Sequence, residues 1–147
     1  MNKGKILMLL ILAILTFSCQ KGYKQEYKTF AEFNEKNERN KGWFPPIIHN
    51  DVTDLRNVSY LDPLCAFGKF NYKNSGFYDS IFSANEKISF DLFNNKVEQN
   101  IKLKPNWFLD LKEFDKSNVE VIKKEEFYVL KNKKDKTIYF ILSNSIP

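Results

Sequence analysis

The chain has 147 residues, of which 43% are hydrophobic and 28% are charged, with 23 basic and 18 acidic side chains. This length is enough for one modest domain with its own hydrophobic core. Only Arg39 and Arg56 are arginines, and arginine is the residue best suited to recognise phosphates and bases in bidentate fashion. We therefore expect no binding to nucleic acid.

The first 18 residues have the organisation of a secretory signal. Lys3 and Lys5 precede an uninterrupted apolar run from Ile6 to Leu15, and a small residue precedes Cys19. The run is shorter than the roughly 20 apolar residues that span a bilayer, which argues against a permanent transmembrane helix. An ordinary cleaved signal with a chance cysteine is the other alternative, but Cys19 follows the apolar segment directly.

Residues 15–19 read Leu-Thr-Phe-Ser-Cys and resemble the lipobox of bacterial lipoproteins, with Thr16 in place of the usual leucine. The resemblance implies that residues 1–18 are removed as a signal peptide and that Cys19 is acylated, as by palmitate. We therefore expect a lipid anchor in the cell membrane or outer membrane, with the protein facing the periplasm or exterior. The removed segment holds two lysines and no acid, so the net charge falls from +5 to +3.

Cys65 is the one cysteine left if Cys19 carries lipid, so no internal disulfide is expected. It lies in an apolar segment, Leu-Cys-Ala-Phe, and a free cysteine packs well as a small hydrophobe. We expect Cys65 to be a buried structural residue, the alternative being a disulfide with a partner.

An amphipathic helix is predicted over residues 24–40. Tyr23, Tyr27 and Phe30 follow one another at spacings of four and three residues, which is typical of the apolar stripe of a helix. Gly42 comes shortly afterwards and is a common helix stop. The apolar stripe would pack against a sheet formed by the rest of the chain.

Strands are predicted where apolar residues alternate or where β-branched and aromatic residues gather. The segments with these properties are residues 52–58, 64–72, 119–122, 127–130 and 137–142. The last two surround a charged segment, residues 131–136, and so predict a β-hairpin. Residues 76–84 suit a short helix, whereas residues 88–97 fit a strand or a helix, and the structure of 76–100 stays open.

Together these elements predict an α+β fold in which the N-terminal amphipathic helix packs on a mostly antiparallel sheet of about four to six strands. Residues 19–24 would form a tether between the lipid and the domain. Residues 25–147 would then form a single small globular domain.

No catalytic or cofactor motif stands out, and we expect neither a cofactor nor a metal. His49 is the only histidine, and one imidazole does not make a typical zinc site. It could act as a general base beside Asp51 or Asp54, but no nucleophile turn accompanies it. Asp51, Asp54 and Asp62 lack the glycine-punctuated loop of a calcium site, and capping or turn formation is the favoured role of the first two.

Two pairs of large aromatic residues form the candidate binding surface: Trp43 with Phe44, and Trp107 with Phe108. Such residues contribute strongly to cores and interfaces alike, so packing of the neighbouring Pro-Pro segment on the sheet is the favoured role, and a groove for a ligand or partner is the alternative. The charged turn, residues 131–136, is expected to be solvated rather than bound to anionic lipid headgroups.

Two segments resemble the signature of the YbbD head-type domains, a family of small exported bacterial proteins and lipoproteins. The segments are residues 41–48, which read Lys-Gly-Trp-Phe-Pro-Pro-Ile-Ile, and residues 53–55, which read Thr-Asp-Leu. That signature runs Gly-Trp-x-Pro, then an aliphatic residue and a Ser-Ala-x-Asp-Ile-like segment. His49 stands here where a proline is usual, and Asp51 and Val52 replace Ser-Ala. The resemblance implies a small α+β domain and transfers no catalytic residue.

The expected function is therefore that of a membrane-anchored accessory protein of the cell envelope. Its partners would be the membrane, through the N-terminal lipid, and another envelope protein or component. The alternative is a small envelope hydrolase that uses His49 with a nearby aspartate.

Overall fold

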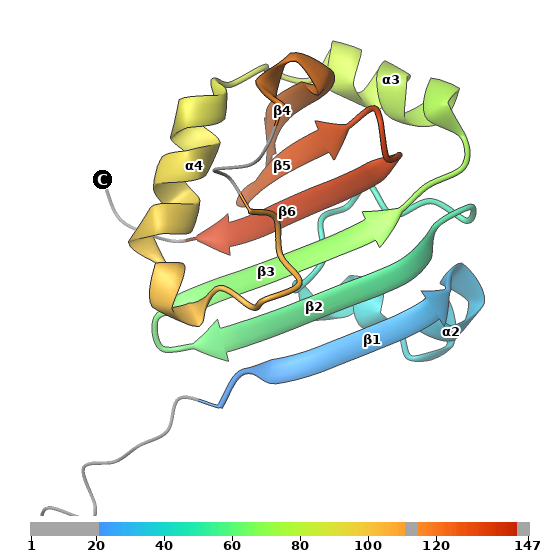
Figure 1. The fold of residues 1–147 in the computed structure, drawn as a ribbon. Coiled ribbons are helices and arrows are strands. Elements are labelled where there is room, and N and C mark those ends of the chain that lie inside the picture. The colour runs from blue at the N-terminus through green and yellow to red at the C-terminus, as the bar shows by residue number, and fades with distance from the viewer. Residues whose placement is uncertain (1–20, 111–114, 144–147) are drawn as a thin grey trace, which may run out of the picture.

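The computed structural model describes residues 21–110 and 115–143, and its centre is a six-stranded antiparallel sheet in the order β1-β2-β3-β6-β5-β4 (Figure 1). The strands are β1 (Tyr23–Thr29), β2 (Thr53–Leu61), β3 (Leu64–Asn71), β4 (Val119–Lys124), β5 (Phe127–Asn132) and β6 (Thr137–Ser143). The α-helices are α2 (Phe30–Glu35), α3 (Ser75–Ala84) and α4 (Phe90–Gln99). Within the described ranges, no helix is both long and apolar enough to cross a membrane.

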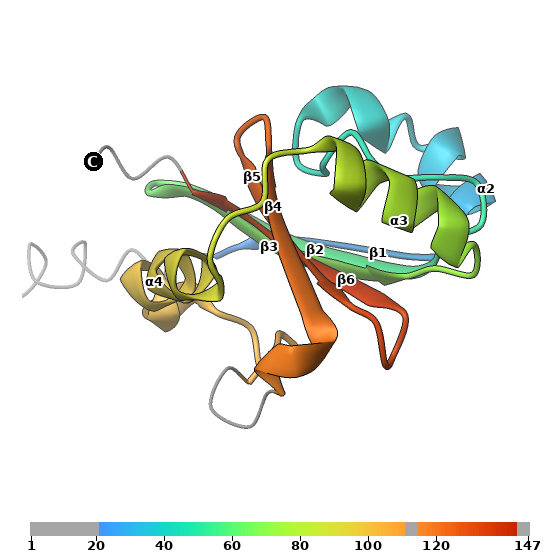
Figure 2. The same cartoon turned by 90° about the horizontal axis from the view of Figure 1, so that it is seen from above.

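The sheet separates two hydrophobic clusters, because successive side chains of a strand point to opposite faces. On β3, Ala66 and Phe70 belong to one cluster, whereas Cys65 and Phe67 belong to the other. Helices α2 and α3 cover the first face, and α4 covers the second, as the view from above shows (Figure 2). We call these the α2/α3 face and the α4 face.

The predicted helix over residues 24–40 is wrong, and with it the predicted fold class. Residues 23–29 form an edge strand, β1, which pairs antiparallel with β2 from Tyr23–Ser59 to Thr29–Thr53. A spacing of four residues, as between Tyr23 and Tyr27, places two side chains on one face of a helix but also on one face of a strand. Pairing with β2 decides between the two.

The strand gives way to a short helix at Thr29. Its backbone is extended, and its Oγ1 accepts a hydrogen bond from the Glu32 amide at 3.3 Å, while the Glu32 carboxylate accepts one from the Lys28 amide at 2.8 Å. The first bond satisfies an amide that the first turn of a helix leaves without a partner, and the second joins the end of β1 to the helix. Helix α2 then ends at Glu35, and Asn37 takes a left-handed conformation with φ of 52°.

Other predicted elements agree with the structure. The strands expected at 52–58, 64–72 and 119–122 are β2, β3 and β4, and the expected hairpin is β5–β6. The segment that stayed open is helical, because Asn74 and Ser89 cap α3 and α4 by accepting hydrogen bonds from the amides of Phe77 and Leu92.

The two ends of the sheet hold different groups. At the N-terminal end lie the start of β1, the β2–β3 turn and the β4–β5 turn. At the opposite end, the lysine end, lies the β5–β6 turn with Lys133, Lys134 and Lys136, beside the end of β3. Seven residue steps along β3 separate the two ends, or about 23 Å at the usual rise of a strand.

Candidate binding groove

The four aromatic residues predicted as a binding surface lie on opposite faces of the sheet. Phe44 is buried on the α2/α3 face, with its ring centre 5.0 Å from that of Phe33, and Trp43 packs at the margin of the same cluster. Phe108 is buried on the α4 face, and Trp107 packs beside it at 6.3 Å. The structure thus brings together the members of each pair, but not the two pairs.

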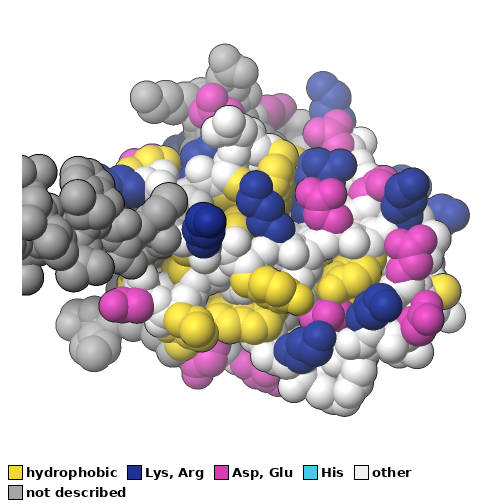
Figure 3. All heavy atoms as spheres, turned by 90° about the horizontal axis from the view of Figure 1, so that it is seen from below, with side chains coloured by type: hydrophobic (Ala, Val, Ile, Leu, Met, Phe, Trp, Pro, Cys, Tyr) yellow, Lys and Arg dark blue, Asp and Glu magenta, His cyan; other side chains and the backbone are white. Residues whose placement is uncertain are grey.

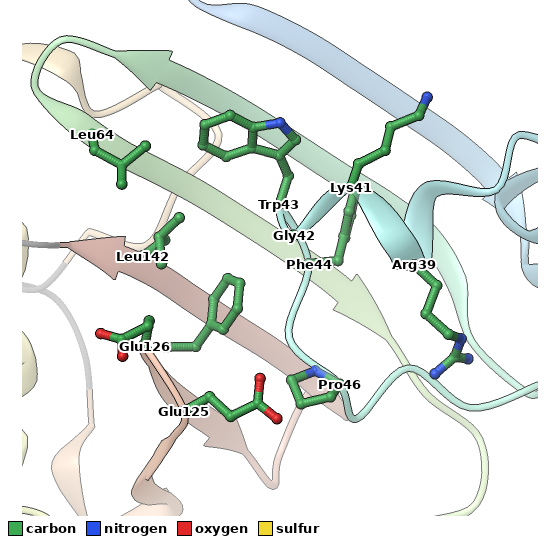
Figure 4. Close-up of a pocket in the computed structure, with 11 residues that line it drawn as sticks. Arg39, Lys41, Gly42, Trp43, Phe44, Pro46, Leu64, Glu125, Glu126 and Leu142 are labelled. Atoms are coloured by element: carbon green, nitrogen blue, oxygen red, sulfur yellow. The ribbon is translucent and has the colours of Figure 1, made fainter.

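An open groove of about 500 Å³ lies beside Trp43 (Figure 4). One side comes from the segment that follows α2, and the other comes from the β4–β5 turn, with Leu64 of the β2–β3 turn at its margin. The lining residues are Arg39, Lys41, Gly42, Trp43, Phe44, Pro46, Leu64, Glu125, Glu126, Phe127 and Leu142. Aromatic and aliphatic side chains form the base of the groove, and charged side chains flank it.

The sequence explains why the chain bends around this groove. Gly42 ends a short 3-10 helix (Glu38–Lys41) with φ of 77°, a left-handed conformation that glycine adopts without a steric penalty. Pro45 and Pro46 then fix the backbone and carry no amide donor, so this side of the groove needs no strand partner. Trp43, between these features, is half-buried and keeps part of its indole in the groove.

Two hydrogen bonds hold the next part of the segment against the core. The Arg39 guanidinium donates to the carbonyl oxygen of Ile48 at 2.7 Å, and the buried Tyr78 hydroxyl donates to that of Ile47 at 3.2 Å. Burial, as the largest influence, raises the pKa of Tyr78, so its hydroxyl keeps its proton and remains a donor. The groove is therefore formed by a fixed segment of backbone.

The charges in the groove are not equivalent. Lys41 forms an ion pair with Glu38 at 2.7 Å, and Arg39 is engaged with the backbone. Among the described residues, the carboxylates of Glu125 and Glu126 have no ion-pair or hydrogen-bond partner, and both residues are exposed. The charge that remains available to a ligand is negative.

A buried polar cluster supports the groove from behind, and sequence reasoning missed it. Glu38 is only 2% exposed, and its carboxylate accepts a hydrogen bond from the side-chain amide of Gln25 on β1. The side-chain oxygen of Gln25, Oε1, in turn accepts a hydrogen bond from the side-chain amide of Asn57 on β2 at 2.9 Å. Burial, followed by the hydrogen bond to Glu38, raises the pKa of Tyr27. The alternation of Tyr23, Gln25 and Tyr27 with charged residues was the available signal, since it places Gln25 on an inward face of a strand.

His49 and Asp51 form a hydrogen-bonded pair at the lysine end. The Nδ1 atom of His49 lies 2.8 Å from Oδ1 of Asp51, and the imidazole lies against the Phe77 ring with centroids 4.1 Å apart. The other oxygen of Asp51 accepts hydrogen bonds from the backbone amides of Lys73 and Asn74. Asp51 therefore joins its loop to the start of α3.

The electrostatics of Asp51 fit this structural role. Burial acts to raise the pKa of its carboxyl, but hydrogen bonds from the Asn74 amide, His49 and the Lys73 amide outweigh burial and hold the pKa below its ordinary value. Asp54 bonds to Asn71 instead of His49. In the described part of the chain, no hydroxyl or thiol is hydrogen-bonded to the imidazole, and no cluster of three His, Cys, Asp or Glu residues could hold a metal ion.

Of the two cysteines, Cys65 lies within the described residues. Cys65 is fully buried on the α4 face, as predicted, and desolvation raises the pKa of its thiol to about 12. A thiol with this pKa stays protonated and unreactive at neutral pH. Cys19 and the predicted signal peptide lie outside the described residues.

Residues 22–71 match the family model of the YbbD head domain. The matched segment is about a third of the chain, and it runs from just before β1 to the end of β3. It contains Trp43, Phe44 and His49, whereas Trp107 and Phe108 lie outside it. No curated protein and no solved structure matches the chain. The match supports the resemblance found in the sequence and extends it upstream of residue 41.

Proposed function

We propose that the protein is a lipid-anchored, non-enzymatic envelope protein that binds a segment of a partner protein in the groove beside Trp43. The observation that carries this proposal is the groove itself, about 500 Å³ with an aromatic base and two unpaired carboxylates at one side. Binding sites are typically concave and mostly apolar, with a few polar groups that orient the ligand. The lipid anchor is inferred from the sequence around Cys19.

The chemistry of the groove favours a partner segment with an apolar side chain next to a basic one. The apolar side chain would lie against Trp43 and Phe127, and the basic one would pair with Glu125 or Glu126. A large aromatic residue at the centre of an interface is a frequent source of binding energy. Trp43 is thus the residue expected to contribute most.

Site-specific crosslinking tests this proposal. A photoreactive benzoylphenylalanine replaces Trp43 in one variant and Trp107 in a second, which serves as the matched control on the opposite face. In living cells of the native host, irradiation should give a discrete adduct with a partner protein at position 43 and none at position 107. Identical adduct patterns at both positions, or none at position 43, would contradict the proposal.

Charge reversal then tests whether the partner segment carries a basic side chain. In the crosslinking variant at position 43, the substitutions Glu125→Lys and Glu126→Lys should reduce the adduct several-fold, because the basic side chain of the partner would meet like charge. An unchanged yield would show that the carboxylates take no part. The matched control is Glu26→Lys, because Glu26 is an exposed glutamate on β1 that lies outside the groove.

The second candidate is a small envelope hydrolase, and the hydrogen bond between His49 and Asp51 favours it. A carboxylate on Nδ1 is the arrangement that orients a catalytic imidazole. His49→Ala separates the candidates, because a hydrolase would lose activity while a binding protein would keep its adduct at position 43. We expect the adduct to persist, since His49 does not line the groove.

A further inference from the structure

We propose that the β2–β3 turn at the N-terminal end of the sheet rests in the interfacial region of the membrane that holds the chain. This inference rests on the proposed lipid anchor at Cys19. The surface involved, which we call the apolar tip, consists of Tyr23, Leu61, Leu64 and Ile101.

The apolar tip holds four of the five large hydrophobic side chains that are exposed in the described part of the chain. Leu61 is 81% exposed, and all four residues of the turn, 61–64, are exposed. A single exposed leucine is ordinary, but a group of apolar residues at one end of a domain indicates an interaction surface.

Pairing and packing place these residues together. Tyr23 lies opposite Ser59 on β2, two residues before Leu61, and Leu61 pairs with Leu64. The turn that carries Ile101 approaches the β2–β3 turn from the α4 face: the Tyr60 hydroxyl donates to the carbonyl oxygen of Leu103 at 3.1 Å, and Ile101 lines a hollow together with Pro63. Seen from the β1 side, hydrophobic side chains reach the surface between acidic and basic ones (Figure 3).

The short connection to Cys19 identifies the membrane as the occupant of this surface. Four residue steps separate Cys19 from Tyr23, so an extended chain spans at most about 14 Å between them. Strand β2 runs antiparallel to β1 and ends two residues beyond the partner of Tyr23, so the turn projects from the end of the sheet at which β1 starts (Figure 1). An anchored domain therefore carries its apolar tip next to the bilayer.

The charges at this end are mixed. Lys21, Lys24 and Lys102 favour anionic headgroups, whereas Asp62, Glu98, Glu125 and Glu126 oppose them. Electrostatic attraction therefore cannot select this orientation, and apolar contact together with the anchor must do so. The lysine end, which carries Lys133, Lys134 and Lys136, lies about 23 Å farther along the sheet.

Fluorescence quenching by brominated phosphatidylcholine tests the proposal in the mature protein, purified from the native host and reconstituted into vesicles. One variant carries Leu61→Trp, and the matched control carries Lys134→Trp in the exposed turn at the lysine end. The emission that Leu61→Trp adds to wild type should shift to the blue and be strongly quenched. The emission that Lys134→Trp adds should be unaffected.

Flotation of the same vesicles separates failure of this inference from failure of the anchor. If wild type does not float with vesicles, the proposed anchor is wrong and the inference falls with it. If it floats and Leu61→Trp emission is not quenched beyond wild type, the anchor stands and the inference is overturned. A blue shift without quenching would show that a second copy or another protein covers the apolar tip, which also overturns it.

Discussion

The two ends of the sheet differ in whether they expose large apolar side chains. At the N-terminal end, Leu61 and Leu64 are in contact with solvent, whereas at the lysine end the surface is charged and one lysine, Lys131, is fully buried. Polar groups therefore contribute to stability at the lysine end, while apolar groups at the N-terminal end remain free to bind. Exposure and burial thus separate residues that stabilise this fold from residues that are available to a membrane or partner.

Lys131 shows how the lysine end is held together. Its ammonium lies 2.6 Å from Asp79 on α3 and 2.7 Å from Glu120 on β4, and 4.7 Å from the centre of the Phe82 ring. Burial acts to lower the pKa of Lys131, but the two carboxylates outweigh it and the pKa is raised. The lysine stays charged and joins α3 to the edge of the sheet.

The largest expected effect follows from removing this charge. Lys131→Ala should lower the free energy of unfolding by about 3 kcal/mol, because it leaves the half-buried Glu120 without its main partner. Urea unfolding of the mature protein measures this cost. The control is Lys133→Ala, whose half-exposed side chain lies 3.3 Å from Glu120 and should cost about 0.5 kcal/mol or less. If the two variants lost the same free energy of unfolding, the buried Lys131 would not be what holds the lysine end together.

A smaller effect is expected at Asp51. Asp51→Ala removes a carboxylate that accepts hydrogen bonds from two backbone amides, and should cost about 2 kcal/mol at pH 7. Because the folded-state pKa of Asp51 is lowered, its contribution is complete above the unfolded pKa of about 3.9 and is lost as the pH falls through the folded value. The stability difference between variant and wild type should therefore shrink as the pH falls below 4.

A surface control makes the pH experiment specific. Asp91→Ala removes a carboxylate that is 81% exposed and 3.5 Å from Lys116, and it should cost about 0.5 kcal/mol or less at pH 7. If Asp51→Ala behaves like Asp91→Ala at every pH, the loop of His49 is not held by Asp51.

The smallest effect is expected at the apolar tip. Leu61→Ser should change the free energy of unfolding in solution by about 0.5 kcal/mol or less, because the leucine side chain is mostly solvent-exposed in the fold. Leu92→Ser, on α4 at 38% exposure, is the comparison variant outside the tip and should cost more, about 1 kcal/mol, because most of its side chain is covered. A cost above about 1.5 kcal/mol for Leu61→Ser would mean that this leucine packs into the domain.

The comparison of sequence with structure shows where local patterns decide the fold and where they do not. The β5–β6 hairpin was predictable because two β-branched and aromatic runs surround a short polar turn. The turn itself is shorter than predicted, since Lys131 and Asn132 belong to β5 and are buried. No local pattern reveals that a lysine will find two carboxylates on other elements.

The N-terminal error has a local and a non-local cause. The local signal was the Thr29-x-x-Glu32 sequence, which marks the start of a helix at residue 29 instead of 24. The non-local cause is the pairing of β1 with β2, which lies about 30 residues further along the chain. The aromatic residues were identified as important, but only the sheet assigns Trp43 and Trp107 to opposite faces.

The central claim is that Cys19 holds the domain on a membrane, and incorporation of radiolabelled palmitate in the native host tests it most directly. Wild type and Cys65→Ser should be labelled equally, because Cys65 is fully buried on the α4 face. Cys19→Ser should take up no label and should accumulate as uncleaved precursor. Label retained by Cys19→Ser, or lost from Cys65→Ser, would contradict the lipid anchor and the orientation derived from it.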